Sequence, residues 1–143
     1  MAGKVNLFQQ QFSEAKKTLI ENATLSATAF RYSTGIEAVT LKNSKGYVTL
    51  LPFMGQMICD MEFLNHNLVM KSIFDEPLKS YYSFEESYGC FLMHCGLTAM
   101  GNPTAEDTHI PHGELPIAQY AESYILCGED EKGKYISLSG VYR

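Results

Sequence analysis

The stretch IEAVTLKNSKGYVTLLP, residues Ile36 to Pro52, decides the fold class of this 143-residue chain. Apolar residues alternate with small or polar ones on both sides of Asn43–Gly46, and this period of two is typical of strands with one buried face. The central residues, NSKG, favour a hairpin turn because glycine adopts a positive φ at little cost. We therefore predict two antiparallel strands joined by a tight turn.

The alternating pattern recurs along most of the chain. TLSATAFRY precedes the hairpin and QMICDMEFL follows it, with NHN (Asn65–Asn67) as a tight turn and LVMKSI as the return strand. Near the end, IAQYAESYILC and KYISLSGVYR flank GEDEKG, which again predicts strand, turn and strand. Strands joined by short turns favour a mainly β fold, an antiparallel β-sandwich.

The N-terminal segment has a different period. Apolar residues recur there at helical spacing: Leu7, Phe8, Phe12, Ala15, Leu19 and Ile20. This predicts one amphipathic helix from about Asn6 to Glu21. We expect a single domain over residues 1–143, with the helix within 1–22 and the strands within 23–143.

Composition and charge narrow the class of protein. Hydrophobic residues make up 45% and charged residues 19%, which is typical of a globular chain. The net charge is −5 and there is no basic run, so we expect neither nucleic acid nor an anionic membrane as a partner. The N-terminus has no signal-peptide pattern, and we expect a cytoplasmic protein.

The four cysteines predict free thiols. Cys59, Cys90, Cys95 and Cys127 have no C-x-x-C spacing, and the chain is not short and Cys-dense. We therefore expect buried free thiols and not disulfides or a zinc knuckle.

The residues with chemical potential lie mostly in the least regular stretch, from about Glu85 to Leu115. HIPHGELPIA (His109–Ala118) places His112 and Glu114 beside Gly113, and GCFLMHCGLTAMGNP (Gly89–Pro103) contains His94. Gln56, which follows Gly55, is a further polar candidate at the start of a strand. Long loops held by rigid strands often carry binding residues.

Three chemistries fit these residues. Two histidines and a carboxylate can ligate a metal, but H-x-x-H in a loop with prolines lacks the i,i+4 spacing of a helical site and the H-x-H spacing of a cupin. Cys95 and His94 are neighbours, and neighbours on a strand point to opposite faces, which disfavours a nucleophilic dyad. An imidazole beside a glycine can also hydrogen-bond a sugar and transfer protons, or it can simply fix the loop.

A family resemblance favours the sugar interpretation. LPFMGQMICDMEFLNHNLVMKSIFDEP, then GCFLMHCGLTAMGNP and HIPHGELP, resemble in order and spacing the galactose mutarotase-like, or aldose 1-epimerase, superfamily. The H-C-G form at His94–Gly96 is similar to an uncharacterised branch of it. The resemblance covers roughly residues 36–143 and implies part of a large β-sandwich (supersandwich) that binds a monosaccharide and interconverts its anomers without metal or organic cofactor.

The resemblance also implies roles for individual residues. His112 matches the H-G histidine, which contacts the sugar near its ring oxygen, and we expect it to be catalytic. His94 stands where the family often has an arginine, and His112, His94, Gln56 and Glu114 are the expected sugar contacts. The family's principal acid histidine and its glutamate base come from a second half, so we expect this chain to be an N-terminal piece without full activity alone.

Two alternatives stay open from the sequence: a non-catalytic carbohydrate-binding or assembly module, and a cupin-like metal enzyme. The final strand is still alternating at Arg143. An unpaired edge near residues 136–142 would recruit either a second copy of the chain or the remaining half of the sandwich.

Overall fold

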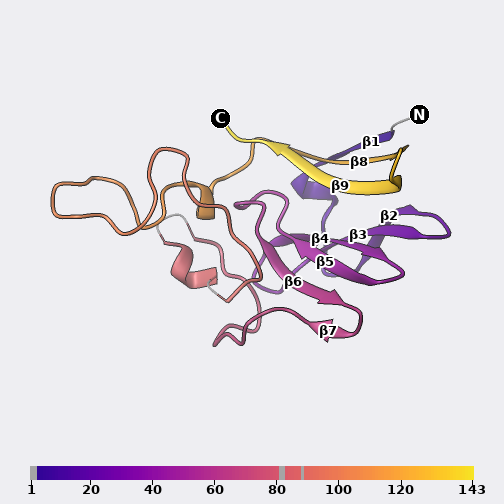
Figure 1. Ribbon diagram of the computed structural model, residues 1–143, viewed down its shortest axis with the longest axis horizontal. Helices are drawn as coiled ribbons and strands as arrows, with labels where there is room; N and C mark the ends of the chain where they lie inside the picture. Colours follow the sequence, from indigo (N-terminus) through magenta and orange to yellow (C-terminus); the bar gives the residue numbers. More distant parts are fainter. Residues whose placement is uncertain (1–2, 81–82, 88) are drawn as a thin grey trace.

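The computed structural model describes residues 3–80, 83–87 and 89–143. Over these residues the chain forms two antiparallel sheets joined by loops and short 3-10 helices (Figure 1). The three-stranded sheet has the order β1 (Gly3–Leu7), β8 (Glu122–Asp130), β9 (Gly133–Val141). The six-stranded sheet follows chain order: β2 (Lys17–Glu21), β3 (Leu25–Arg31), β4 (Glu37–Asn43), β5 (Gly46–Leu50), β6 (Ile58–Phe63), β7 (His66–Asn67). The 3-10 helices are η1 (Gln9–Gln11), η2 (Phe84–Ser87) and η3 (Leu115–Ile117).

The two sheets share one apolar core, which confirms the predicted sandwich of antiparallel strands. Alternate residues of β3 and β4 point into this core, where they meet Leu7 of β1 and Ile125 of β8. The central buried residues are Leu7, Phe12, Ala27, Ala29, Val39, Leu41, Phe53 and Ile125. A second buried cluster lies around the segment that follows β5. It consists of Ile36, Ala38, Leu51, Met54, Met57 and Cys90. Burial of this apolar surface is the main favourable term in folding.

The hairpin predicted from the NSKG turn is confirmed. β4 ends at Asn43 and β5 begins at Gly46, with Asn43 and Gly46 paired across the turn. The Asn43 side-chain oxygen accepts the N–H groups of Lys45 at 2.8 Å and Gly46 at 3.1 Å. This local hydrogen bonding is the reason asparagine is favoured at such turns. The β8–β9 hairpin around GEDEKG is confirmed as well.

The hairpin predicted around Asn65–Asn67 is partly wrong. The turn residues are Leu64 and Asn65, both with positive φ (49° and 64°), and the return strand β7 contains two residues. The Asn67 side-chain oxygen accepts the N–H of Val69 at 2.9 Å, a local bond that competes with the ladder of a strand. LVMKSI therefore runs as an irregular segment away from β6.

The predicted N-terminal helix over Asn6–Glu21 is wrong. The segment contains the end of β1, the 3-10 turn η1 and the strand β2. β1 pairs with β8 in register from Gly3 opposite Cys127 to Leu7 opposite Ser123, a contact between the two ends of the sequence. Leu7 is buried but Phe8 is 55% exposed, so the apolar residues of the predicted helix do not lie on one buried face. Tertiary strand pairing overrides the local period here.

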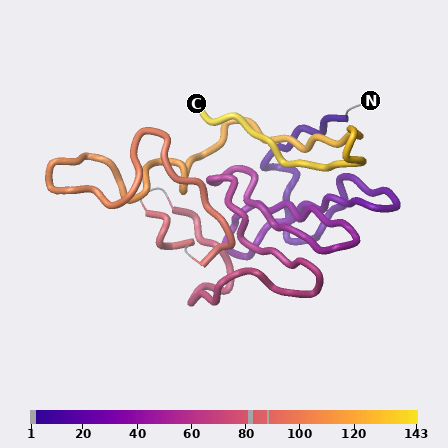
Figure 2. Tube along the Cα trace, in the orientation of Figure 1, coloured from indigo at the N-terminus to yellow at the C-terminus, as the bar shows by residue number. Residues whose placement is uncertain are grey.

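The irregular part of the chain lies to one side of both sheets (Figures 1 and 2). It runs from the end of β7 to the start of β8, and its orange portion extends farthest from the sandwich. The predicted irregular stretch from about residue 85 to 115 falls within it. Among the described residues, no helix is long and apolar enough to cross a membrane.

Candidate functional site

Three segments that carry candidate residues meet where this irregular region contacts the six-stranded sheet. Gly55 donates its N–H to the carbonyl of Ala118 at 2.8 Å, beside a β-bridge between Met54 and Gln119. A Cβ on Gly55 would lie 2.5 Å from the carbonyl oxygen of Pro116, so glycine is required for this close approach. The segment that follows His112 is thereby fixed to the end of the six-stranded sheet.

The H-C-G and H-G segments are joined directly to each other. Gly96 donates its N–H to the carbonyl of His112 at 2.9 Å, and Leu115 donates to the carbonyl of Gly96 at 2.8 Å. Gly113 has φ +79°, and a Cβ there would lie 2.3 Å from the carbonyl oxygen of Ala99. The glycine next to His112 therefore allows two backbone segments to approach each other, and the two histidine-bearing motifs form one loop cluster.

Glu114 organises this cluster. Its carboxylate accepts the N–H of Leu97 at 3.1 Å and the hydroxyl of Thr98 at 2.8 Å. Hydrogen bonds from its own backbone N–H and from the Thr98 side chain lower the pKa of the Glu114 carboxyl. The observed role of this residue is to hold the loop after Gly96, and Thr98, its partner, was not singled out from the sequence.

His112 occupies a constrained backbone position with φ +63°. Its N–H donates to the carbonyl of Gly101 at 2.8 Å, and its ring lies edge-on to Phe84 at 5.0 Å between centroids. The side chain is half-buried, while His94 is exposed. Within residues 3–80, 83–87 and 89–143, neither imidazole has a hydrogen-bond partner, so both rings keep a donor and an acceptor for a ligand.

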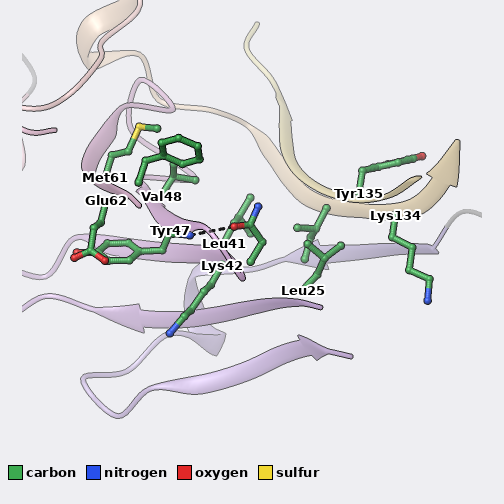
Figure 3. A pocket seen from close by; sticks show the side chains of 13 residues that line it. Leu25, Leu41, Lys42, Tyr47, Val48, Met61, Glu62, Lys134 and Tyr135 are labelled. Atoms are coloured by element: carbon green, nitrogen blue, oxygen red, sulfur yellow. Dashed lines mark hydrogen bonds between the residues drawn. The ribbon is translucent and has the colours of Figure 1, made fainter. Parts of the chain in front are cut away.

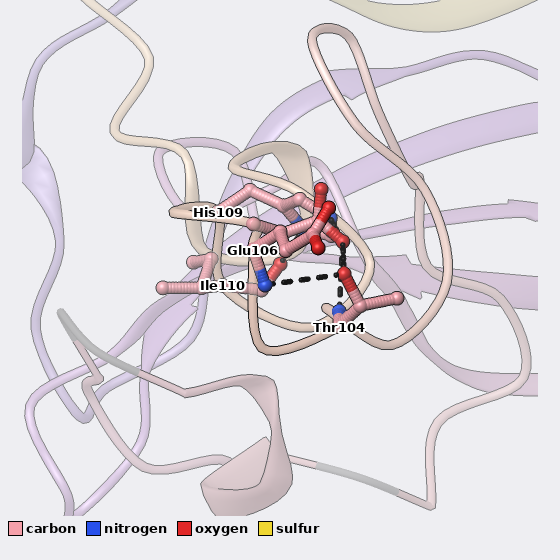
Figure 4. A network of polar contacts seen from close by, with 5 residues as sticks. Thr104, Glu106, His109 and Ile110 are labelled. Atoms are coloured by element: carbon pink, nitrogen blue, oxygen red, sulfur yellow. Dashed lines mark hydrogen bonds and ion pairs between the residues drawn. The ribbon is translucent and has the colours of Figure 1, made fainter.

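The third histidine of the region, His109, is held by its own loop (Figure 4). Its Nδ1 donates a hydrogen bond to the carbonyl oxygen of Ile110 at 2.8 Å. Its Nε2 lies 4.0 Å from the Asp107 carboxylate. The same carboxylate accepts the N–H and the hydroxyl of Thr104, and the Thr104 N–H chiefly lowers the pKa of Asp107. His109 therefore serves as an internal comparison for His112.

Gln56 lies near these loops but its amide points elsewhere. The residue has φ +44°, and its Nε2 is buried with no hydrogen-bond partner among the described residues. A Cβ on Gly140 would lie 2.3 Å from that nitrogen, which places the amide against β9. The structure thus joins the segments that carry His94, His112 and Glu114, and it directs the Gln56 side chain to the three-stranded sheet.

A cavity of about 300 Å³ lies elsewhere, at the open end between the two sheets (Figure 3). Leu25, Leu41 and Val48 of the six-stranded sheet line it together with Tyr135 of β9. The candidate histidines do not line this cavity; they belong to the loop surface beside the sandwich.

The remaining sequence expectations concern metals and thiols. In the described parts of the chain, no group of three His, Cys, Asp or Glu residues is arranged to hold a metal ion, so the cupin-like alternative finds no ligand set there. The four cysteines are free thiols, as predicted, but Cys90 alone of these four is buried, and the others are half-buried.

Comparisons with known proteins bear on the fold. No protein-family model and no curated protein matches the sequence. A crystal structure described as a "putative aldose 1-epimerase" from Klebsiella pneumoniae subsp. pneumoniae superposes with a TM-score of 0.76 at 14% identity. The match covers 98% of this chain and 42% of that one, so the chain spans less than half of its length. The chain therefore has the fold of the corresponding part of that aldose 1-epimerase-type structure.

Proposed function

We propose that the chain is a carbohydrate-active protein that acts at the anomeric centre of a monosaccharide, as an aldose 1-epimerase does. The fold shared with the Klebsiella structure supports this proposal. The observation that carries it is the pair of backbone hydrogen bonds by which Gly96 joins His112 and Leu115. These bonds hold the segment after His94 against the segment of His112, which supports a sugar site shared by the two segments.

The proposed reaction requires two proton transfers. A base removes the proton of the anomeric hydroxyl while an acid protonates the ring oxygen, and the bond between C1 and the ring oxygen breaks. C1 becomes a carbonyl, the C1–C2 bond rotates, and the reverse transfers close the ring on the other face. Imidazole is a common general acid, and His112 is proposed to donate the proton to the ring oxygen.

His94 and a second proton carrier complete the proposed site. His94 is exposed and its imidazole has no hydrogen-bond partner among the described residues, which suits a hydrogen bond to a sugar hydroxyl. The carboxylate of Glu114 is engaged with Leu97 and Thr98, so the base is proposed to come from another segment. In the described part of the chain β9 pairs with β8 and its other edge is open, and a second half or a second copy would add its residues through that edge.

An anomer-exchange measurement by NMR tests the activity. Glucose and galactose are incubated with the chain, and exchange between α and β anomers is compared with the spontaneous rate. The chain carries the proposed acid but not the proposed base, so we expect a partial acceleration of exchange, and His112→Ala should return it to the spontaneous rate because general acid catalysis is lost. His109→Ala is the matched control, since its imidazole is bound to its own loop. Equal acceleration by the wild type and His112→Ala would contradict the assignment.

A non-catalytic carbohydrate-binding module is the second candidate. It is favoured by the Glu114 carboxylate, which is engaged with Leu97 and Thr98 and so does not supply a base to the loop cluster. Sugar-dependent shifts of the loop residues together with a purely spontaneous exchange rate would support this function over the enzymatic one. Acceleration that depends on His112 would exclude it.

A further inference from the structure

Two of the four cysteines, Cys59 and Cys90, lie on backbone segments that are hydrogen-bonded to each other. Ile58 of β6 forms an antiparallel bridge with Leu92, and its N–H donates to the Leu92 carbonyl at 2.9 Å. The Ile58 carbonyl accepts two N–H groups, from Phe91 at 2.9 Å and from Leu92 at 3.2 Å. Two residues of one strand thus oppose one residue of the other, which is the pattern of a β-bulge. The bulge shifts the register by one residue and places Cys90 opposite Cys59.

The backbone of this pair fits a disulfide. The bridge at Ile58 is hydrogen-bonded, so Cys59 and Cys90 form the next, non-hydrogen-bonded pair. In such a pair the two Cα atoms are about 4.5 Å apart, and both side chains point to the same face. Disulfides join cysteines whose Cα atoms are about 4.4–6.8 Å apart. The two sulfur atoms can therefore bond without a large movement of either backbone segment.

Side-chain packing agrees with this register. Cys90 belongs to the second buried cluster, and Cys59 packs against the same cluster. Both cysteines also line one cavity of about 690 Å³, which lies between β6 and the irregular segment after β7. Burial is the main cause of the raised pKa of the Cys59 thiol, and a charge on Cys90 would raise that pKa further. The cavity gives a small reagent in solution a route to both sulfur atoms.

The sulfur atom of Cys59 is held by two polar groups. Its S–H donates to the carbonyl of Thr49 at 3.4 Å, and the Tyr32 hydroxyl lies 3.6 Å from the same sulfur. Because the one thiol proton is used at Thr49, the Tyr32 hydroxyl is left to donate to the sulfur. Burial raises the pKa of Cys59 to about 11, and the bond from Tyr32 partly opposes that rise because it stabilises the thiolate. Burial also raises the pKa of Cys90, so both thiols react slowly at neutral pH.

We propose that Cys59 and Cys90 are a redox-responsive pair, which a low-molecular-weight disulfide such as oxidised glutathione converts to a reversible cross-link. The thiolate of one cysteine attacks the glutathione disulfide, forms a mixed disulfide and releases one glutathione thiolate. The thiolate of the other cysteine then attacks the protein sulfur of the mixed disulfide, closes the protein disulfide and releases the second glutathione thiolate. The two thiol protons end on the two glutathione molecules, so two protein thiols are oxidised and one small disulfide is reduced.

The cross-link would fix one wall of the cavity. In the reduced chain the Glu76 carboxylate attaches that wall to the loop before β4, because it accepts the hydroxyl of Ser33 at 2.7 Å and the N–H of Thr34 at 3.3 Å. A disulfide also constrains the unfolded chain over the whole loop from Cys59 to Cys90. We therefore expect the oxidised chain to have a midpoint of thermal unfolding about 5–10 °C above that of the reduced chain.

The other two cysteines provide the matched control. Cys95 lies in the H-C-G segment, and Cys127 of β8 lies opposite Gly3 of β1. Among the described residues, neither belongs to the buried cluster that contains Cys90. Replacing both by serine therefore leaves the proposed pair intact. The proposal uses neither His94 nor His112, so it is independent of the proposed sugar chemistry.

Peptide mapping of the full chain tests the proposal. The wild type, the double variant Cys95→Ser/Cys127→Ser and the same variant with Cys90→Ser are incubated with oxidised glutathione at pH 8, alkylated, digested and analysed by mass spectrometry. We expect a cross-linked peptide containing Cys59 and Cys90 in the first two proteins, which dithiothreitol removes. We expect complete loss of this peptide with Cys90→Ser. Thermal unfolding of each reduced protein verifies that it is folded.

The results that would overturn the proposal are distinct from these. They are a wild type whose thiols all stay reduced, stable mixed disulfides with glutathione at Cys59 or Cys90, and a cross-link that involves Cys95 or Cys127 instead. An unchanged midpoint of thermal unfolding in the oxidised double variant would overturn it as well, because a cross-link that fits the folded backbone raises that midpoint.

Discussion

Gly96 and His112 are joined by a backbone hydrogen bond of 2.9 Å between the N–H of the first and the carbonyl of the second. This bond connects two segments that sequence inspection treats as separate motifs. Their glycines have different roles in it: Gly96 supplies both a donor and an acceptor, while Gly113 leaves room for the neighbouring backbone. The arrangement of the candidate histidines therefore depends on backbone contacts, and it can be disturbed without altering either imidazole.

Gly113→Ala is expected to destabilise the loop cluster. The added Cβ would lie 2.3 Å from the carbonyl oxygen of Ala99, at a residue with φ +79°. Backbone strain and overlap together should lower the free energy of unfolding by about 2–4 kcal/mol, as measured by chemical denaturation.

Gly101→Ala is the control for that substitution. Gly101 has the same φ, +79°, but a Cβ there meets no atom within 4 Å. We expect it to cost about 1 kcal/mol, from backbone strain alone. Equal costs for Gly101→Ala and Gly113→Ala would contradict the close approach of Gly113 to Ala99.

The Glu114 carboxylate should make the loop sensitive to acid. Its pKa is lowered in the folded state, chiefly by hydrogen bonds from its own N–H and from Thr98, so its stabilising effect is present above the ordinary carboxyl pKa. The effect is lost as the pH falls through the lowered folded value. Amide exchange of Leu97 and Thr98 should therefore accelerate in acid, relative to strand amides. In Glu114→Gln the pH dependence should disappear; its persistence would assign the effect to another group.

Cys59 should be a slow nucleophile at neutral pH. Burial raises the pKa of its thiol to about 11, although the hydrogen bond with Tyr32 partly opposes that shift. The thiolate is the reactive form, so little of it is present near pH 8. Alkylation by iodoacetamide, followed by mass spectrometry, should modify Cys59 slowly in the folded chain and rapidly after unfolding. Rapid modification of the folded chain at pH 8 would contradict the raised pKa of the Cys59 thiol.

Ile125→Ala measures the packing between the two sheets. Ile125 of β8 is 0% exposed and contacts the core residues of the six-stranded sheet, so the substitution should lower the free energy of unfolding by about 2–5 kcal/mol. Ile73→Ala, at a side chain that is 92% exposed, should change it by less than about 0.5 kcal/mol. A small effect at Ile125 would mean that the sheets do not form one core.

The strands could be predicted from the sequence where apolar and polar residues alternate within one short stretch. The hairpin at Asn43–Gly46 was predictable because strand period and turn chemistry agree within a few residues. The N-terminal helix was predicted wrongly because the pairing of β1 with β8 joins the two ends of the chain, and no local pattern reports such a contact. The i,i+4 spacing of Phe8 and Phe12 was compatible with a helix as well.

The candidate site was predictable as a set of residue types and not as an arrangement. His94, His112 and Glu114 stood out through their neighbours, and the structure brings their segments together. The direction of the Gln56 amide, towards Gly140, depends on where β9 lies, which the sequence around Gln56 does not encode.

The imidazole resonances of the four histidines test the central claim most directly. The chain contains His66, His94, His109 and His112, so each ring can be assigned in an NMR spectrum through single substitutions. On titration with glucose and galactose, our account predicts shifts for His94 and His112 with at least one of the sugars, while His66 and His109 stay in place. Unchanged resonances for His94 and His112 at saturating concentrations of both sugars would contradict the proposed sugar site.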